Sequence, residues 1–167
     1  MSLEARRRRE LRARRRAARL RGELARVHEA FPGMQIVQRR RDVGEMAGEP
    51  TPFSSYLEGN ITSNQRNTYR IAMLLDGYPQ EMPLAYVVEP SLRQADGTGL
   101  ARLGGSQPMH TLPPDVYGHV QMCLVNDRTW RTTTTLVSLV MRARVWVEAY
   151  EAYLDTGTPL DRFLGHG

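Results

Sequence analysis

Cys123 is the only cysteine of the chain and the first candidate for covalent chemistry. It lies in the stretch GHVQMCLVNDRTW, residues 118–130, at the end of a long segment rich in glycine and proline. A cysteine attacks as its thiolate, and an unperturbed thiol with a pKa of about 8.5 is only a few per cent thiolate at neutral pH. Two interpretations are open: a nucleophile presented by a loop, or a small apolar residue of the core. The glycine- and proline-rich surroundings favour the nucleophile.

Three polar side chains stand close to this cysteine in sequence. His119 lies four residues before it and His110 thirteen before it, and either can tune the thiol or take a proton from an attacking amine. Asp127, four residues after it, can orient or deprotonate such an amine. The alternative for the histidines is a surface position without a role, and for Asp127 an ordinary turn residue. We expect Trp130 to pack beneath the loop.

Neither a metal site nor a phosphate-binding loop is indicated. The four histidines are scattered and one cysteine accompanies them, which is not the spacing of metal ligands. No glycine-rich turn stands between a strand and a helix, as a phosphate cradle would. We therefore expect no metal and no other cofactor.

Positive charge is concentrated at the N-terminus. Residues 1–30 contain eleven arginines and four glutamates, a net charge of +7, whereas the rest contains twelve arginines and fourteen acidic residues, a net charge of −2. The basic character therefore belongs to one segment, which is either a solvated helix or a helix laid along a nucleic-acid backbone.

Lysine is absent, and all 23 basic residues are arginine. A genome that uses arginine in place of lysine accounts for this. A second and compatible explanation is that a protein handling an amine-reactive group is safer without side-chain amines of its own.

Helical and strand patterns position these residues in one domain, residues 1–167. Residues 2–30 predict one long helix. The apolar stripe begins only at Ala13, so the arginine-rich part, residues 1–16, is expected to project from the body or to lie along its rim. A second helix is predicted from about Thr134 to Leu154, followed by a short tail, residues 155–167.

Between the helices the pattern predicts four strands and then a long loop. The strands are expected at residues 34–40, 53–61, 67–75 and 84–88, with a surface loop over 42–52. Four consecutive strands favour an antiparallel meander, so the fold class is α+β. Residues 90–122 show no regular pattern, and a loop of that length in a small domain is typically functional.

This order of elements, with three local motifs, resembles a ubiquitin-conjugating enzyme. That family has an N-terminal helix, a four-stranded meander, a tyrosine-proline turn before a proline-bracketed strand, a long active-site loop delivering a catalytic cysteine, a nearby tryptophan and a central helix. The matching features here are Tyr78-Pro79 with Pro83, Cys123-Leu124, Trp130 and the helix from about Thr134. The resemblance covers nearly the full chain to about residue 154.

The resemblance implies a transferase that carries a ubiquitin-like modifier as a thioester on Cys123 and passes it to an acceptor amine. The family's His-Pro-Asn motif, whose Asn is thought to stabilise the oxyanion, is replaced by Asp115-Val116-Tyr117. Tyr117 and Asp115 are therefore the candidates for oxyanion or acceptor contacts. This departure and the short C-terminus are similar to bacterial relatives encoded with ubiquitin-like modifiers and activating enzymes, or in antiphage defence systems.

The family's N-terminal helix docks the activating enzyme, which implies partner-binding roles for Arg7, Arg8, Arg12, Arg15 and Arg16. The expected partners are an activating-enzyme-like adenylating protein, a ubiquitin-like modifier and an acceptor protein. With one cysteine, no secretion signal and no long apolar stretch, we expect a cytoplasmic protein. The alternatives are an arginine-rich nucleic-acid-binding protein and a non-catalytic scaffold of the same fold.

Overall fold

The computed structural model describes residues 3–40 and 53–165. Within them, helix α1 (Leu3–Ala30) leads into a single antiparallel sheet, and helix α2 (Leu136–Thr156) follows the sheet in sequence. The α+β class predicted from the sequence is confirmed at this level. The predicted surface loop over residues 42–52 lies outside the described residues. Neither described helix combines the length and apolar character that crossing a membrane requires.

The four predicted meander strands are confirmed to within two residues. Each strand pairs with the next in antiparallel register. In chain order they are β1 (Gln35–Arg40), β2 (Phe53–Thr62), β3 (Thr68–Leu74) and β4 (Leu84–Glu89).

In the described part of the chain the sheet has six strands, where the sequence predicts four. Strands β5 (Thr111–Leu112) and β6 (Val120–Met122) lie within residues 90–122, for which no regular structure is predicted. The sheet order is β1-β2-β3-β4-β6-β5, so β6 extends the meander beside β4 and carries β5 on its other side. Strands of two and three residues are too short to show an alternating pattern, because period-two alternation needs about four residues to be recognised.

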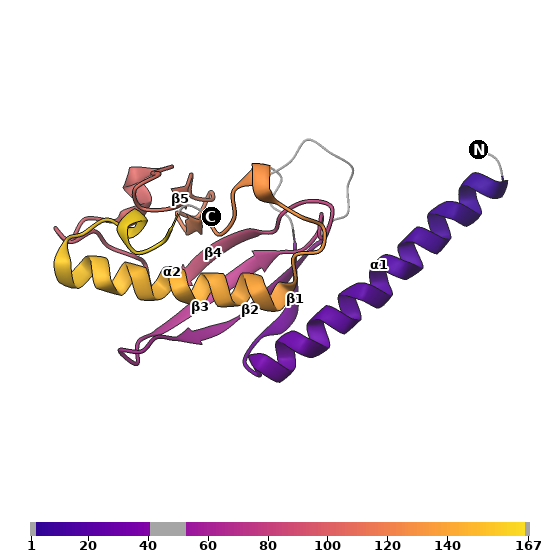
Figure 1. Ribbon diagram of the computed structural model, residues 1–167, viewed down its shortest axis with the longest axis horizontal. Coiled ribbons are helices and arrows are strands. Elements are labelled where there is room, and N and C mark those ends of the chain that lie inside the picture. Colours follow the sequence, from indigo (N-terminus) through magenta and orange to yellow (C-terminus); the bar gives the residue numbers. More distant parts are fainter. Residues whose placement is uncertain (1–2, 41–52, 166–167) are drawn as a thin grey trace.

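Helix α2 covers one face of the sheet, as Figure 1 shows, and forms the core with it. It begins after Thr135, whose side chain accepts a hydrogen bond from the Ser138 amide, and ends at Gly157 in a left-handed conformation with φ 71°. Its buried stripe faces alternating residues of the central strands. The fully buried members include Leu136, Val140, Ala143, Trp146 and Val147 of α2 with Leu57, Ile71, Met73 and Val87 of the sheet.

Acidic side chains of α2 hold the turn between β2 and β3. Glu151 accepts hydrogen bonds from the Ser63 hydroxyl, the Asn67 amide group and the Tyr69 hydroxyl, all through Oε1. Glu148 accepts from the backbone amide of Asn64 at 2.8 Å. These contacts fix the far end of the hairpin, so the sheet and helix have one relative orientation.

The buried side chains of helix α1 lie in its C-terminal half. Val27 and Glu23 are buried, whereas residues 3–18 are all exposed. The N-terminal half extends away from the rest of the molecule (Figure 1). At the other end of the chain, within the predicted tail, Leu160 of a short 3-10 helix (Leu160–Arg162) is fully buried and so belongs to the core.

Candidate functional site

Cys123 follows directly on β6 and sits at the border between sheet and loop. Its backbone amide donates to the carbonyl of His110 at 2.9 Å. Its side chain is half-buried, with Sγ 3.9 Å from the carbonyl of Val125. The backbone position of the thiol is thus fixed by strand pairing, and the residue is partly buried.

The segment opposite Cys123 is anchored to the second helix. His110 adopts a left-handed conformation with φ 48°, a region in which histidine is more tolerated than most residues. Its carbonyl accepts both the Cys123 amide and Nε1 of Trp146, each at 2.9 Å. Trp146 stacks on Tyr150 with ring centroids 5.8 Å apart. Cys123 is therefore connected through one carbonyl to the aromatic core of α2.

Burial and a nearby carboxylate make the thiol less acidic. Desolvation raises the pKa of Cys123 above its ordinary value, and the negative charge of Asp127 raises it further. Asp127 opens a short 3-10 helix (Asp127–Thr129), which Asn126 caps by accepting from the amide of Arg128. Of the three candidates His110, His119 and Asp127, Asp127 is the one whose charge raises the pKa of the thiol.

Trp130 packs beneath this loop, as the sequence predicts. Its ring meets that of Tyr78 edge-on at a centroid distance of 6.4 Å, and its Nε1 donates to the carbonyl of Pro79 at 3.3 Å. The Tyr78 hydroxyl donates to the carbonyl of Thr134 at 2.8 Å. The loop after the cysteine is therefore tied at two points to the Tyr78-Pro79 turn.

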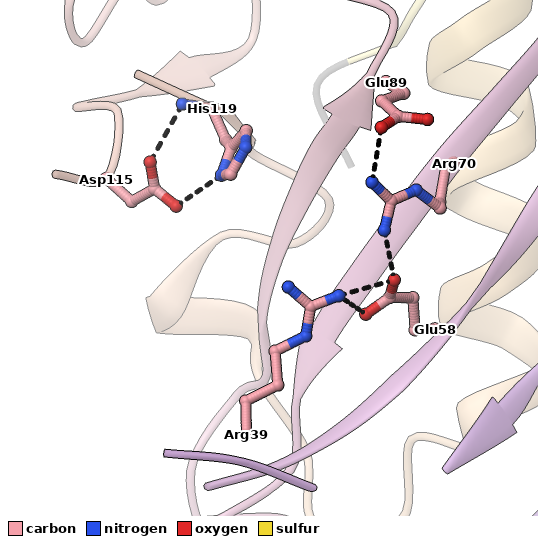
Figure 2. Close-up of polar contacts among 6 residues, drawn as sticks. All are labelled: Arg39, Glu58, Arg70, Glu89, Asp115 and His119. Carbon is pink, nitrogen blue, oxygen red and sulfur yellow. Dashed lines mark hydrogen bonds and ion pairs between the residues drawn. The ribbon is translucent and has the colours of Figure 1, made fainter. Parts of the chain in front are cut away.

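Asp115 and His119 form a hydrogen-bonded pair, shown in Figure 2. Asp115 Oδ2 lies 2.7 Å from Nδ1 of His119, and Oδ1 accepts the backbone amides of Tyr117 and His119. Gly118 closes the turn with φ 81°, a conformation that favours glycine. Asp115 thus acts as an acceptor on both oxygens and orients the imidazole of His119, while Tyr117 is mostly exposed.

The pair lies at the opposite end of β6 from Cys123. His119 and Cys123 are four residues apart across an extended strand, which separates their Cα atoms by about 13 Å. The pKa of Glu89 is lowered first by Arg70 and to a lesser degree by the charge of His119. The structure therefore groups Cys123 with Asp127, and Asp115 with His119 and Tyr117, as two separate clusters.

A chain of ion pairs crosses the four meander strands near the Asp115 pair (Figure 2). Arg39 on β1 lies 2.7 Å from Glu58 on β2, and Arg70 on β3 bonds Glu58 at 2.6 Å and Glu89 on β4 at 2.7 Å. Glu58 is buried although it is charged. No local pattern in the sequence marks this series of ion pairs, because the four residues meet only through the strand register.

The arginine candidates fall into two groups. Arg7, Arg8, Arg12 and Arg15 are exposed on the part of α1 that extends away from the body. Arg16 donates to the backbone carbonyls of Asp76 and Tyr78, the latter at 2.9 Å. Arg16 therefore anchors α1 to the turn that also supports Trp130.

A cavity of about 470 Å³ lies away from the cysteine, between the start of β3, the segment after β4 and the C-terminal half of α2. Its lining includes Asn67, Arg93 and Tyr150 but not Cys123. Among residues 3–40 and 53–165 no group of three or more histidine, cysteine or acidic side chains is placed to hold a metal ion.

Comparison with known proteins assigns no relationship. The chain matches no protein-family model, and no significant match is found among curated proteins or solved structures.

Proposed function

We propose that the protein is a conjugating enzyme of the ubiquitin-conjugating type, which carries a ubiquitin-like modifier as a thioester on Cys123 and transfers it to an amine. The observation that carries this proposal is the position of Cys123. The only thiol of the chain follows the strand that extends the meander, is partly buried, and is held by the His110 carbonyl ahead of a loop anchored by Trp130.

The chemistry requires two acyl transfers. In the first, the Cys123 thiolate attacks the activated carbonyl at the modifier's C-terminus, a new carbon–sulfur bond forms, and the previous carrier leaves as its own thiolate. In the second, an acceptor amine attacks the Cys123 thioester, an amide forms, the Cys123 thiolate leaves, and the amine's proton passes to a base. We assign that base to Asp127, which stands four residues after Cys123 and whose negative charge raises the pKa of the thiol.

A raised cysteine pKa is compatible with this reaction. An incoming thioester is reactive and is held in position by its carrier protein, so a small thiolate fraction is sufficient. A thiol that is mostly protonated is also less readily oxidised when no modifier is bound. The partners that this proposal requires are an adenylating activating protein, a ubiquitin-like modifier and an acceptor, and a bacterial defence system is the setting we favour.

The Asp115 pair has a different role in this proposal. The Cα atoms of His119 and Cys123 are about 13 Å apart along the strand, so His119 does not touch the reacting sulfur. Because both carboxylate oxygens of Asp115 already accept hydrogen bonds, Asp115 positions His119 at the edge of the site. An acceptor that approaches along β6 would meet this imidazole before it reaches Cys123.

Intact mass spectrometry tests the proposal directly. The protein is produced together with the products of its neighbouring genes, as wild type and as Cys123→Ser and Cys123→Ala variants. We expect an adduct of modifier mass on the wild type that reductant removes, a reductant-resistant ester or no adduct with serine, and none with alanine. An adduct on the alanine variant, or none on the wild type beside an active adenylating partner, refutes the thioester role.

A further inference from the structure

Arginines surround the projecting part of α1 on every side. Residues 3–19 contain nine arginines against Glu4 and Glu10, a net charge of +7. Successive residues of a helix are rotated by about 100°, so the run Arg6, Arg7, Arg8, Arg9 covers the whole circumference. The arginines at 12, 14 and 15 fill the same sides one to two turns later. This half of the helix therefore has no neutral face.

An apolar docking face is also lacking. Leu3 and Leu11 are the large apolar residues of this half, 80% and 51% exposed, and they stand eight residues apart. A helix that docks in a protein groove or lies on a membrane presents apolar residues at i, i+3, i+4 and i+7. Residues 3–15 present no such stripe, so their charge pattern disfavours a flat or apolar partner.

The projecting half of α1 is anchored to the body by the two arginines at its base. Arg16 bonds the carbonyls of Asp76 and Tyr78, and the guanidinium of Arg19 lies 5.6 Å from the centroid of the Tyr78 ring. Beyond this anchor, residues 3–15 extend for about 20 Å at 1.5 Å per residue. The body thus presents a helix of about 13 residues whose side chains are exposed on all sides.

We propose that residues 3–15 of α1 bind duplex DNA by entering the major groove, with arginines reaching the phosphates of both strands. The groove is about 12 Å wide and a helix with its side chains is about 10–12 Å across, so phosphates flank the helix on both sides. Guanidinium groups pair with phosphate oxygens in a two-pronged geometry. The deep, narrow major groove of duplex RNA does not admit such a helix.

Self-repulsion within the helix supports a polyanionic occupant. Arg8 and Arg12 stand at i,i+4, as do Arg12 and Arg16, and like charges at this spacing destabilise a helix. The ion pair of Arg6 with Glu10, at 3.3 Å, offsets only part of this repulsion. Phosphates on both sides remove it. Because contacts are to phosphates, binding is largely independent of base sequence.

The test is fluorescence anisotropy with a labelled 20-base-pair duplex over a range of NaCl concentrations. The helix variant replaces Arg7, Arg8, Arg12 and Arg15 by glutamine. The matched control replaces four exposed arginines of the body, Arg102, Arg128, Arg131 and Arg162, by glutamine, so both variants lose the same charge. The Cys123→Ser variant shows whether binding is separate from the thioester chemistry, on which this inference does not rest.

We expect the helix variant to lose at least about tenfold in affinity at 100 mM NaCl, and its plot of log K against log [NaCl] to flatten by about 0.9 for each phosphate contact removed. Lysine at the same four positions should restore the slope, because counterion release depends on charge. The body control and Cys123→Ser should bind as wild type does.

Any of the following results overturns the proposal: no binding by the wild type, an equal loss in the body control, failure of lysine to restore the slope, or equally tight binding to polyglutamate or anionic vesicles of phosphatidylglycerol. Single-stranded DNA and duplex RNA of equal length complete the series. Either of them binding as tightly as duplex DNA also excludes insertion in the major groove.

Discussion

The reactivity of Cys123 is determined by its immediate neighbours. Its backbone is fixed by the His110 carbonyl, and its pKa is raised first by burial and then by Asp127. A thiol in this environment reacts slowly with weak electrophiles at neutral pH, since the thiolate is the nucleophile. Such a residue suits a carrier that meets only activated acyl groups.

Removing the Asp127 charge should make the thiol more reactive. In Asp127→Asn the pKa of Cys123 falls, so alkylation by iodoacetamide at pH 7.5 should accelerate at least about twofold, because more thiolate is present. At a pH well above the thiol pKa the two proteins should react alike. Asp155→Asn, which removes an equal charge from the end of α2, is the control and should match wild type. Slower alkylation of Asp127→Asn than of wild type would contradict the conclusion that Asp127 raises the pKa of Cys123.

The sequence predicts the Cys123 neighbourhood better than the Asp115 cluster. Asp127 and Trp130 follow the cysteine so closely that their proximity needs little tertiary information. His119 is equally close in sequence, but the extended strand β6 carries it away from the thiol and the Gly118 turn delivers it to Asp115. A spacing of four residues thus separates His119 from Cys123 across a strand but brings Asp115 and His119 together across a turn. Composition alone does not distinguish these two cases.

At the scale of elements, the two helices are joined by a buried carboxylate. Glu23 on α1 is 4% exposed, and its Oε2 accepts the amide of Leu136, the first residue of α2, at 3.0 Å. A carboxylate at a helix N-terminus satisfies an otherwise unbonded amide and interacts favourably with the helix dipole. Glu23 therefore caps a helix more than 100 residues further along the chain.

Loss of this cap should destabilise the protein. Glu23→Ala leaves a buried amide without its acceptor and is expected to lower the free energy of unfolding by about 2 kcal/mol. Glu23→Gln keeps an acceptor and should lower it by about 1 kcal/mol or less. Urea denaturation measures both, with exposed Glu29→Ala as the control within about 0.5 kcal/mol of wild type. An Ala variant as stable as Glu29→Ala would show that the cap contributes nothing.

The ion-pair chain across the sheet should depend most on its central member. Glu58→Gln weakens the contacts with both Arg39 and Arg70. Because Glu58 is buried while both arginines remain partly exposed, we expect the free energy of unfolding to fall by about 2 kcal/mol. Glu89→Gln, at the exposed end, should cost less than Glu58→Gln. Thermal and urea unfolding of both variants checks this order, and the reverse order would contradict it.

Strong periodicity explains which elements are predictable. Strands β1 to β4 are long enough to alternate, and both helices carry caps or proline-glycine stops, so their bounds follow from the chain. Strands β5 and β6 form because β4 offers an edge beside residues 120–122, which is information held in another segment. Glu23 is missed for the same reason, since nothing near it in sequence marks a distant helix terminus.

At the scale of the whole molecule, Tyr78 joins α1, the β3–β4 connection and the loop after Cys123. Its carbonyl accepts from Arg16, its ring contacts Arg19 and Trp130, and its hydroxyl donates to Thr134. Burial raises the pKa of this tyrosine, with a further increase from Glu23. One fully buried side chain therefore connects the basic helix with the cysteine loop.

Two substitutions separate the contributions of Tyr78. Tyr78→Phe removes the hydrogen bond to Thr134 but keeps the ring, and should lower the free energy of unfolding by about 1 kcal/mol. Tyr78→Ala also removes the packing against Trp130 and should cost about 3–5 kcal/mol. Chemical denaturation provides both values. If both variants lost a similar free energy of unfolding, the contribution of Tyr78 would come from its hydroxyl alone.

Because Trp130 contacts Tyr78, its intrinsic fluorescence can report on the surroundings of Tyr78. The second tryptophan, Trp146, is 1% exposed in the core and should emit as a constant background. Trp130 is only partly buried and shares Tyr78 with Arg16 and Arg19. A ligand of α1 can therefore be titrated without any label. A change in the emission spectrum of Trp130 would show that binding to the helix alters the loop after Cys123.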